Sequence, residues 1–167
     1  MTTLDRPPVE RVHPPGVAMK VANPVLRWVL SSPRRASRLG QQLLVLHVTG
    51  RRTGRALDVP VAYRHTADGR LLVLTNSGWR VNLRERPDVE VTLLGRRLPA
   101  RAEIVEDADT VAEVYDALIA TKGHANAARR LGIRVNVDRN PTREELADLV
   151  RRAGLSAVYL DVSEPVR

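Results

Sequence analysis

The chain has 167 residues, enough for one domain of ordinary size, and its 43% hydrophobic and 28% charged residues are a globular composition. Cysteine is absent, which excludes disulfides, thiolate metal sites and cysteine nucleophiles. The net charge is +8 and nearly all basic residues are arginines, whose planar guanidinium groups grip phosphate or carboxylate, so we expect an anionic partner.

The N-terminal third is predicted to hold an arm and two helices. Four prolines lie in the first sixteen residues, so residues 1–22 are expected to be an irregular arm. Asn23-Pro24 and Ser32-Pro33 are typical of helix starts, because the first residue of each pair can cap a helix and proline suits its first position. They predict helices over 25–30 and 34–39. Residues 23–167 are expected to form a single domain.

Strand-forming residues dominate the middle of the chain. Five strands are predicted, over residues 43–49, 57–65, 71–75, 89–94 and 98–105. The turns at 50–55, 67–70 and 95–96 are too short for crossover helices, so the strands should be antiparallel. Residues 76–87 read as a polar connection with one helical turn.

Helices return after residue 105. The pattern Thr110-x-x-Glu113 is typical of a capping box and predicts a helix to about Thr121. Further helices are expected over 125–131 and from Asn140-Pro141 to Ala153, followed by a strand over 155–162. This order predicts an α+β fold on an antiparallel sheet or small barrel.

Few residues in the sequence suit catalysis by side chains. The four histidines have no helical metal-binding spacing, and each is more simply a structural residue. There is no Gly-x-Ser-x-Gly elbow and no phosphate-binding loop of the Walker type. We therefore expect no metal site and no nucleophilic or paired-carboxylate catalysis.

Two segments remain as candidates. The turn Gly50-Arg51-Arg52-Thr53-Gly54-Arg55 combines flexible glycines, a hydroxyl and three arginines, which suits either a phosphate site or a solvated hairpin. Trp79 and Asn82 share one face of a helical turn. Trp79 either closes the core or walls the pocket of a planar ligand.

The ordered combination of three strings resembles the deazaflavin (coenzyme F420)-dependent nitroreductase or quinone reductase family. The strings are Leu46-His47-Val48-Thr49-Gly50-Arg51-Arg52-Thr53-Gly54-Arg55, Val59-Pro60-Val61-Ala62-Tyr63 and Trp79-x-x-Asn82-Leu83. The segment from Asn23 to Pro33 is similar to the N-terminal helix of a short branch of that family. The resemblance runs from about Asn23 to Glu103.

This resemblance implies a split β-barrel, an antiparallel barrel like that of flavin reductases, with flanking helices. It implies that the turn binds the phosphate end of the deazaflavin, whose tail is polyanionic. The residues implied to bind the cofactor are Gly50, Arg51, Arg52, Thr53, Gly54 and Arg55 for the phosphate; Val59, Pro60, Val61, Thr75, Asn76 and Ser77 for the ring; and Trp79 and Asn82 for the tail side. Similar proteins often carry Pro-Arg where this chain has Ala56-Leu57, and a longer loop where it has residues 76–78.

The resemblance implies an oxidoreductase that passes a hydride from reduced deazaflavin to a small hydrophobic, electron-poor acceptor: a quinone, an enone or a nitro compound. The composition makes a cytoplasmic protein the simplest expectation. FMN is the less favoured cofactor. Tyr115 and His124 are the candidate proton donors, with water as the alternative. A monomer or a homodimer is expected.

Two other kinds of protein remain open on the sequence. The first is a non-catalytic barrel that carries a flavin, haem or fatty acid. The second is a basic module that binds a membrane or nucleic acid. Arginines beside Trp28 would let residues 24–38 touch the inner face of a membrane, whereas the five aromatic residues are too few for base stacking, so we expect no nucleic acid.

Overall fold

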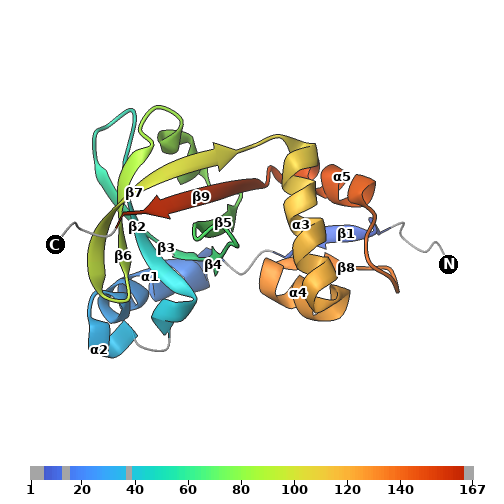
Figure 1. The fold of residues 1–167 in the computed structure, drawn as a ribbon, viewed down its shortest axis with the longest axis horizontal. Coiled ribbons are helices and arrows are strands. Elements are labelled where there is room, and N and C mark those ends of the chain that lie inside the picture. Colours follow the sequence, from blue (N-terminus) through green and yellow to red (C-terminus); the bar gives the residue numbers. More distant parts are fainter. Residues whose placement is uncertain (1–5, 13–15, 37–38, 164–167) are drawn as a thin grey trace. The chain divides into compact units, whose positions relative to one another are not determined.

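The computed structural model describes residues 6–12, 16–36 and 39–163, which divide into two compact units. The sheet unit covers Pro15–Ile104 and Ala157–Arg167, and the helical unit covers Met1–Pro14 and Val105–Ser156. Figure 1 shows the elements of both units. That residues 23–167 behave as a single domain stays a prediction.

The sheet unit contains a curled antiparallel sheet of seven strands. Its helices are α1 (Gly16–Leu30), α2 (Pro33–Ala36) and the 3-10 turns η1 (Leu39–Gln41) and η2 (Gly78–Leu83). Its strands are β2 (Leu43–Thr49), β3 (Ala56–Ala62), β4 (Arg64–His65), β5 (Leu71–Thr75), β6 (Asp88–Leu93), β7 (Arg96–Val105) and β9 (Ser156–Val162). The order across the sheet is β3-β2-β6-β7-β9-β5-β4, so β3 and β4 are its edges. This half-barrel with flanking helices confirms the expected α+β class (Figure 1).

Strand alternation gives the sheet an apolar inner face and a mixed outer face. On β2, Leu44, Leu46 and Val48 are buried in the inner core. Leu43 and Val45 point to the outer face, where they pack on Leu30 of α1. The outer face beyond them is polar, and it begins at His47.

The turns between strands follow the predicted chemistry. Gly69 and Gly95 have φ angles of +86° and +77°, a conformation that glycine adopts without strain. A Cβ atom on Gly95 would lie 2.2 Å from the backbone nitrogen of Pro33, so the β6–β7 hairpin contacts the start of α2 too closely for any side chain.

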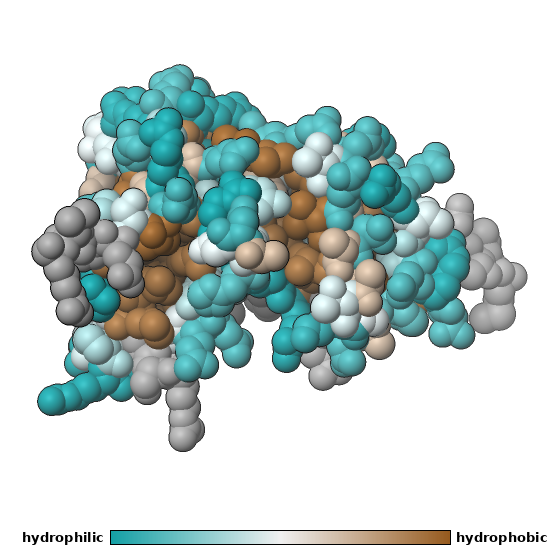
Figure 2. All heavy atoms as spheres, viewed as in Figure 1, coloured by the Kyte–Doolittle hydropathy of each residue, from teal (hydrophilic) through white to brown (hydrophobic). Residues whose placement is uncertain are grey.

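Hydrophobic side chains also reach the surface of the sheet unit. Figure 2 shows hydrophobic surface in the part of this unit that contains α1 and β2. On α1, Val25 and Trp28 are 58% and 61% exposed. The guanidinium carbon of Arg35 lies 4.1 Å from the centre of the Trp28 ring. Within the described residues, no helix combines the length and the apolar character needed to cross a bilayer.

The helical unit holds helices α3 (Ala108–Lys122), α4 (His124–Leu131) and α5 (Arg143–Ala153). It also contains two three-residue strands that we had not predicted, β1 (Val9–Arg11) and β8 (Ile133–Val135), which pair antiparallel. Val9, Tyr115, Ile119 and Leu146 form part of its buried core.

Three predicted helix starts differ from the structure. Helix α1 begins at Gly16 rather than after Asn23, so Pro24 lies inside it and residues 16–22 are not an irregular arm. Helix α3 is capped by Asp107, whose carboxylate accepts from the Thr110 backbone N–H at 2.9 Å, and Thr110 is not the cap. Thr142 rather than Asn140 caps α5.

The cap of α5 predicts an acid-sensitive contribution to stability. Hydrogen bonds from Arg139, and then from the Thr142 backbone N–H, lower the pKa of Glu145 from 4.5 to about 2. A carboxyl group with a lowered pKa stabilises the fold above its unfolded pKa, and this contribution is lost as the pH falls toward the folded value. We expect Glu145→Gln to lower the free energy of unfolding by about 1 kcal/mol or less at neutral pH. In urea titrations the difference from the native protein should disappear between pH 4.5 and about 2. A difference that does not change with pH would contradict the ionic origin.

Candidate functional site

The turn between β2 and β3 is closed by its own backbone. The Gly50 N–H donates to the Arg55 carbonyl oxygen at 2.8 Å, and the Gly54 N–H donates to the Gly50 carbonyl oxygen at 2.8 Å. The Arg55 N–H donates to Thr53 Oγ1 at 3.3 Å. Gly54 has φ +67°, which favours glycine there. The turn is therefore a formed loop whose conformation depends on the two glycines and Thr53.

The tip of this turn keeps unused donors. The backbone N–H groups of Arg52 and Thr53 have no acceptor among the residues that the structure describes. The guanidinium groups of Arg51, Arg52 and Arg55 also have no ion-pair or hydrogen-bond partner among those residues, and all three side chains are exposed. Positive charge without an internal counterion, beside free N–H groups, suits an anionic ligand.

Asn82 fastens the turn to η2. Its side chain is 7% exposed, and Oδ1 accepts from the Arg51 backbone N–H at 2.9 Å. Nδ2 donates to the Trp79 carbonyl oxygen at 2.9 Å. Both ends of the amide are thus engaged within the protein. The structure gives Asn82 a positioning role toward the turn, and direct contact of its side chain with a cofactor stays a prediction.

The loop before η2 is held in a similar way. Thr75 is buried, and its Oγ1 accepts from the Ser77 backbone N–H at 3.0 Å. Arg80 Nη1 donates to the carbonyl oxygens of Asn76 and Ser77 at 2.9 and 3.0 Å. Trp79 is half-buried and packs against the core of the sheet unit. This packing fits the first of the two roles that the sequence allowed, and the second, a wall for the pocket of a planar ligand, stays a prediction.

Edge strand β3 presents a partly exposed apolar strip. Paired residues of an antiparallel sheet share a face, and Leu57, Val59 and Val61 pair with the inward-facing Val48, Leu46 and Leu44. Leu57 is 40% exposed because β3 is an edge. Pro60 pairs with Val45 and lies on the opposite, outer face. Val59 and Val61 can therefore share one apolar ligand surface with Leu57, whereas Pro60 cannot.

These features together fit a ligand with an anionic end and a planar apolar end. The turn offers three guanidinium groups and two backbone donors, and the apolar strip starts two residues after it. Because Leu57 stands at the start of the strip, this part of the surface is apolar rather than charged.

A polar network on the outer face was missed from the sequence. His47 Nδ1 lies 2.7 Å from Asp58 Oδ1, and its Nε2 lies 2.8 Å from Thr92 Oγ1. Glu90, which pairs with His47 in register, accepts two hydrogen bonds from Arg97, and these lower its pKa. His47, Asp58, Glu90 and Arg97 line a cavity of about 380 Å³ together with Thr49 and Ala56, which flank the turn. The available signal was that Asp58, His47 and Thr92 are polar residues at outward-facing positions of three strands in which side chains alternate between the two faces.

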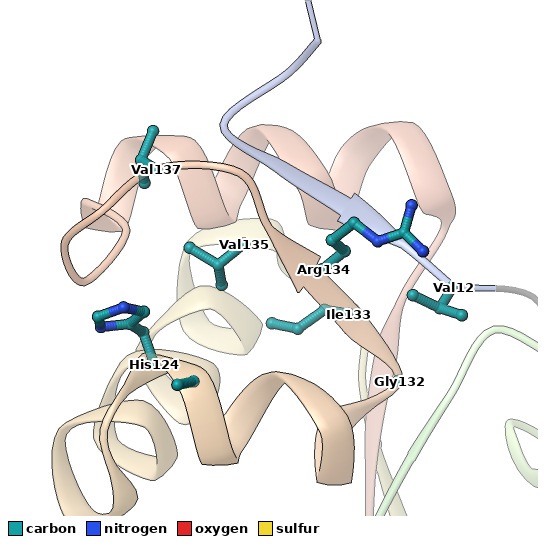
Figure 3. A pocket seen from close by; sticks show the side chains of 8 residues that line it. Val12, His124, Gly132, Ile133, Arg134, Val135 and Val137 are labelled. Carbon is teal, nitrogen blue, oxygen red and sulfur yellow. The ribbon is translucent and has the colours of Figure 1, made fainter.

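The two candidate proton donors lie in the helical unit. Tyr115, on α3, has no exposed surface. His124 is the first residue of α4 and lines a cavity of about 700 Å³ in this unit (Figure 3). No group of three or more metal-ligating side chains occurs within the described part of the chain.

Asn82 provides a test of the turn's anchoring. Asn82→Ala leaves the Arg51 N–H without its acceptor and the Trp79 carbonyl oxygen without its donor. We therefore expect the free energy of unfolding to fall by about 1–3 kcal/mol. Urea titration would measure the loss. The control is Asn136→Ala, which removes a single exposed hydrogen bond from the side-chain amide to the Pro7 carbonyl oxygen. Equal losses in both variants would contradict the anchoring role.

Comparisons with known proteins give a family match. The model of the family described as F420H(2)-dependent quinone reductase matches residues 32–140, more than half of the chain. No curated protein matches. The matched range contains the turn, the apolar strip, η2, α3 and α4.

Solved structures similar to the chain include two F420 reductases and an FMN binding protein. A pyridoxamine 5'-phosphate oxidase-related, FMN binding protein from Nostoc punctiforme has 16% identity over 83% of this chain and 78% of that one, with a TM-score of 0.49. An F420-H2 dependent reductase, FDR-A, has 18% identity over 74% and 95%, with a TM-score of 0.40. Another F420 reductase has 13% identity over 83% and 93%, with a TM-score of 0.40.

Proposed function

The chain belongs to the F420H(2)-dependent quinone reductase family and is thus an oxidoreductase that uses reduced coenzyme F420, and from this premise we propose which acceptor and which residues it uses. The acceptor is a small, electron-poor, hydrophobic molecule: a quinone, an enone or a nitro compound. The observation that carries the proposal is the turn with unpaired guanidinium groups directly before an exposed apolar strip.

The turn holds the anionic part of the coenzyme. Arg51, Arg52 and Arg55 donate charged hydrogen bonds to the phosphate and to the carboxylates of the tail, and the Arg52 and Thr53 N–H groups complete the site. Gly50 and Gly54 allow this turn to form. Asn82 holds the turn in place through its hydrogen bond to the Arg51 N–H, and Trp79 anchors η2 by packing against the core. Both residues therefore position the site.

The apolar strip holds the ring. Leu57, Val59 and Val61 offer an apolar surface on β3, which contacts β5. The segment from Thr75 to Ser77, at the end of β5, is fixed by hydrogen bonds. Pro60 supports this strip from the other face of β3. When bound, the coenzyme supplies the hydride. The protein's own contributions are orientation, exclusion of water and delivery of a proton.

For the proton we favour His124 over Tyr115. Tyr115 is enclosed in the core of the helical unit, where its hydroxyl has no exposed surface. His124 lines a cavity, and histidine is the side chain that most often transfers a proton in enzymes. Water remains the competing donor, and replacement of His124 distinguishes the two.

The proposal is tested by mixing the protein with reduced coenzyme F420 and one acceptor of each class: menadione, 2-cyclohexenone or a nitroimidazole. Oxidised deazaflavin should accumulate, seen by its absorbance and fluorescence, faster than without protein. FMN serves as the control cofactor. Tight binding of the coenzyme without oxidation by any acceptor would instead indicate a carrier.

Contact with a membrane is a second proposal, favoured by one observation. Val25 and Trp28 are exposed on α1 next to the exposed Arg27, Arg34 and Arg35, which is suited to an anionic bilayer surface. Residues 37 and 38 of the expected contact segment lie outside the described residues. Sedimentation with phosphatidylserine-containing vesicles, with a steep loss on raising the salt concentration, would support the contact, which we propose at the inner face of the membrane. A monomer or a homodimer in the cytoplasm fits both proposals.

A further inference from the structure

The helical unit contains a cavity whose described lining residues all belong to this unit. It has a volume of about 700 Å³, within the range of small-molecule pockets. Its wall is mainly aliphatic: Val12, Ala125, Ile133, Val135 and Val137, together with Gly132. A Cβ atom on Gly132 would meet nothing within 4 Å, so this part of the wall borders open space. Figure 3 shows that His124 from α4 and Ile133 and Val135 from β8 point into the same space.

The charges of this cavity favour a neutral ligand. Arg134 is the permanently charged residue among the described residues that line it, and its guanidinium is paired with Glu10 at 3.2 Å. Ile133 is almost fully buried and forms an apolar base. A charged ligand would lose hydration here without gaining a counterion, whereas the removal of an aromatic hydrocarbon body from water is favourable.

His124 adds one directed polar contact. Its Nδ1 lies 3.3 Å from Asn140 Oδ1, and because an amide oxygen only accepts, Nδ1 carries the hydrogen. In the neutral ring Nε2 is then an acceptor, and it has no partner among the described residues. An aliphatic cavity with one directed acceptor selects a ligand with an O–H donor on an apolar body.

We propose that this cavity binds a small neutral aromatic hydroxyl compound, a phenol or a hydroquinone, with its O–H group donating to His124 Nε2. A hydroquinone is also the product that quinone reduction would give, and only this link rests on the proposed function. The binding itself needs no coenzyme.

The test is a titration of the full-length protein with 1-naphthol in the absence of coenzyme, followed by methyl NMR signals of Ile133, Val135 and Val137. We expect saturable shifts with a dissociation constant below about 1 mM. The methyl ether 1-methoxynaphthalene has the same ring without the donor, and it should bind about two- to tenfold more weakly. Absence of saturable shifts, or equal binding of the two compounds, would overturn the proposal.

Two variants locate the site. Ala125→Phe fills the cavity from α4 and should abolish the shifts, whereas Asn126→Phe places the same ring on the next residue, which is exposed and does not line the cavity, and should preserve them. His124→Leu should bring the two naphthalenes to equal affinity while the protein stays folded by circular dichroism. Equal disruption by Asn126→Phe, or a preference for 1-naphthol that persists in His124→Leu, would refute the assignment. Because no coenzyme is present, a protein that binds 1-naphthol but oxidises no reduced F420 would refute the proposed function alone.

Discussion

Coenzyme F420 is expected to bind Arg52→Ala about 10- to 150-fold more weakly than the native protein, because a hydrogen bond from a charged group contributes about 1.5–3 kcal/mol. Arg52 is at the tip of the turn and has no competing internal partner among the described residues. Its guanidinium can therefore bind the phosphate without breaking a hydrogen bond or an ion pair within the protein. Fluorescence titration of the oxidised coenzyme measures the change.

Arg96→Ala is the matched control for this prediction. Arg96 is exposed and opens β7, next to the β6–β7 hairpin turn. The register of β2 with β6 puts this hairpin at the opposite end of the strands from the turn after Thr49. Both variants lose one positive charge, so only a local contact separates them. Equal weakening in the two variants would mean that net charge attracts the coenzyme and that the turn is not its site.

Turnover is expected to fall by about 10²–10⁴-fold in His124→Gln, the range for loss of a general acid. Glutamine keeps a polar side chain of similar reach but does not transfer a proton. Coenzyme affinity should not change, since the turn and the strip are built from other residues. Steady-state oxidation of reduced F420 by menadione, together with the coenzyme titration, separates the two effects.

Tyr115→Phe and His65→Gln are the controls for the donor. Tyr115 is enclosed in the core, so removing its hydroxyl should leave turnover within a factor of about two, and His65 is an exposed histidine of β4. If His124→Gln also stays within that factor, water supplies the proton. A large loss in Tyr115→Phe alone would reverse our choice of donor.

Elements with strong local signals could be predicted from the sequence. The Asp68-Gly69 and Gly95-Arg96 turns located two hairpins, and alternation located β2, β5, β6 and β7 to within one or two residues. Strands β1 and β8 could not be predicted, because three residues carry no period and their pairing joins Val9 to Val135 across the chain. Pro24 misled the prediction of α1, since proline is common at a helix start but here lies within the helix.

The candidate site was predictable in composition but not in geometry. The glycines and arginines of the turn could be selected from the sequence. The hydrogen bond between Asn82 Oδ1 and the Arg51 N–H could not be predicted, since it joins residues that are 31 positions apart. Strand pairing also separated Pro60 from Val59 and Val61, which the sequence had grouped on one ligand surface. The hydrogen-bond partners of His47 could be identified only once the register of β3, β2 and β6 was known.

Pro60 has a consequence for self-association. It lies in the middle of an edge strand, opposite Val45, and has no N–H group to donate. A ladder between β3 and an incoming extended chain would lack a bond at its centre, which is how natural proteins discourage strand addition and fibril growth at open edges. The apolar strip on β3 can therefore stay accessible to small molecules without making the edge a template for aggregation.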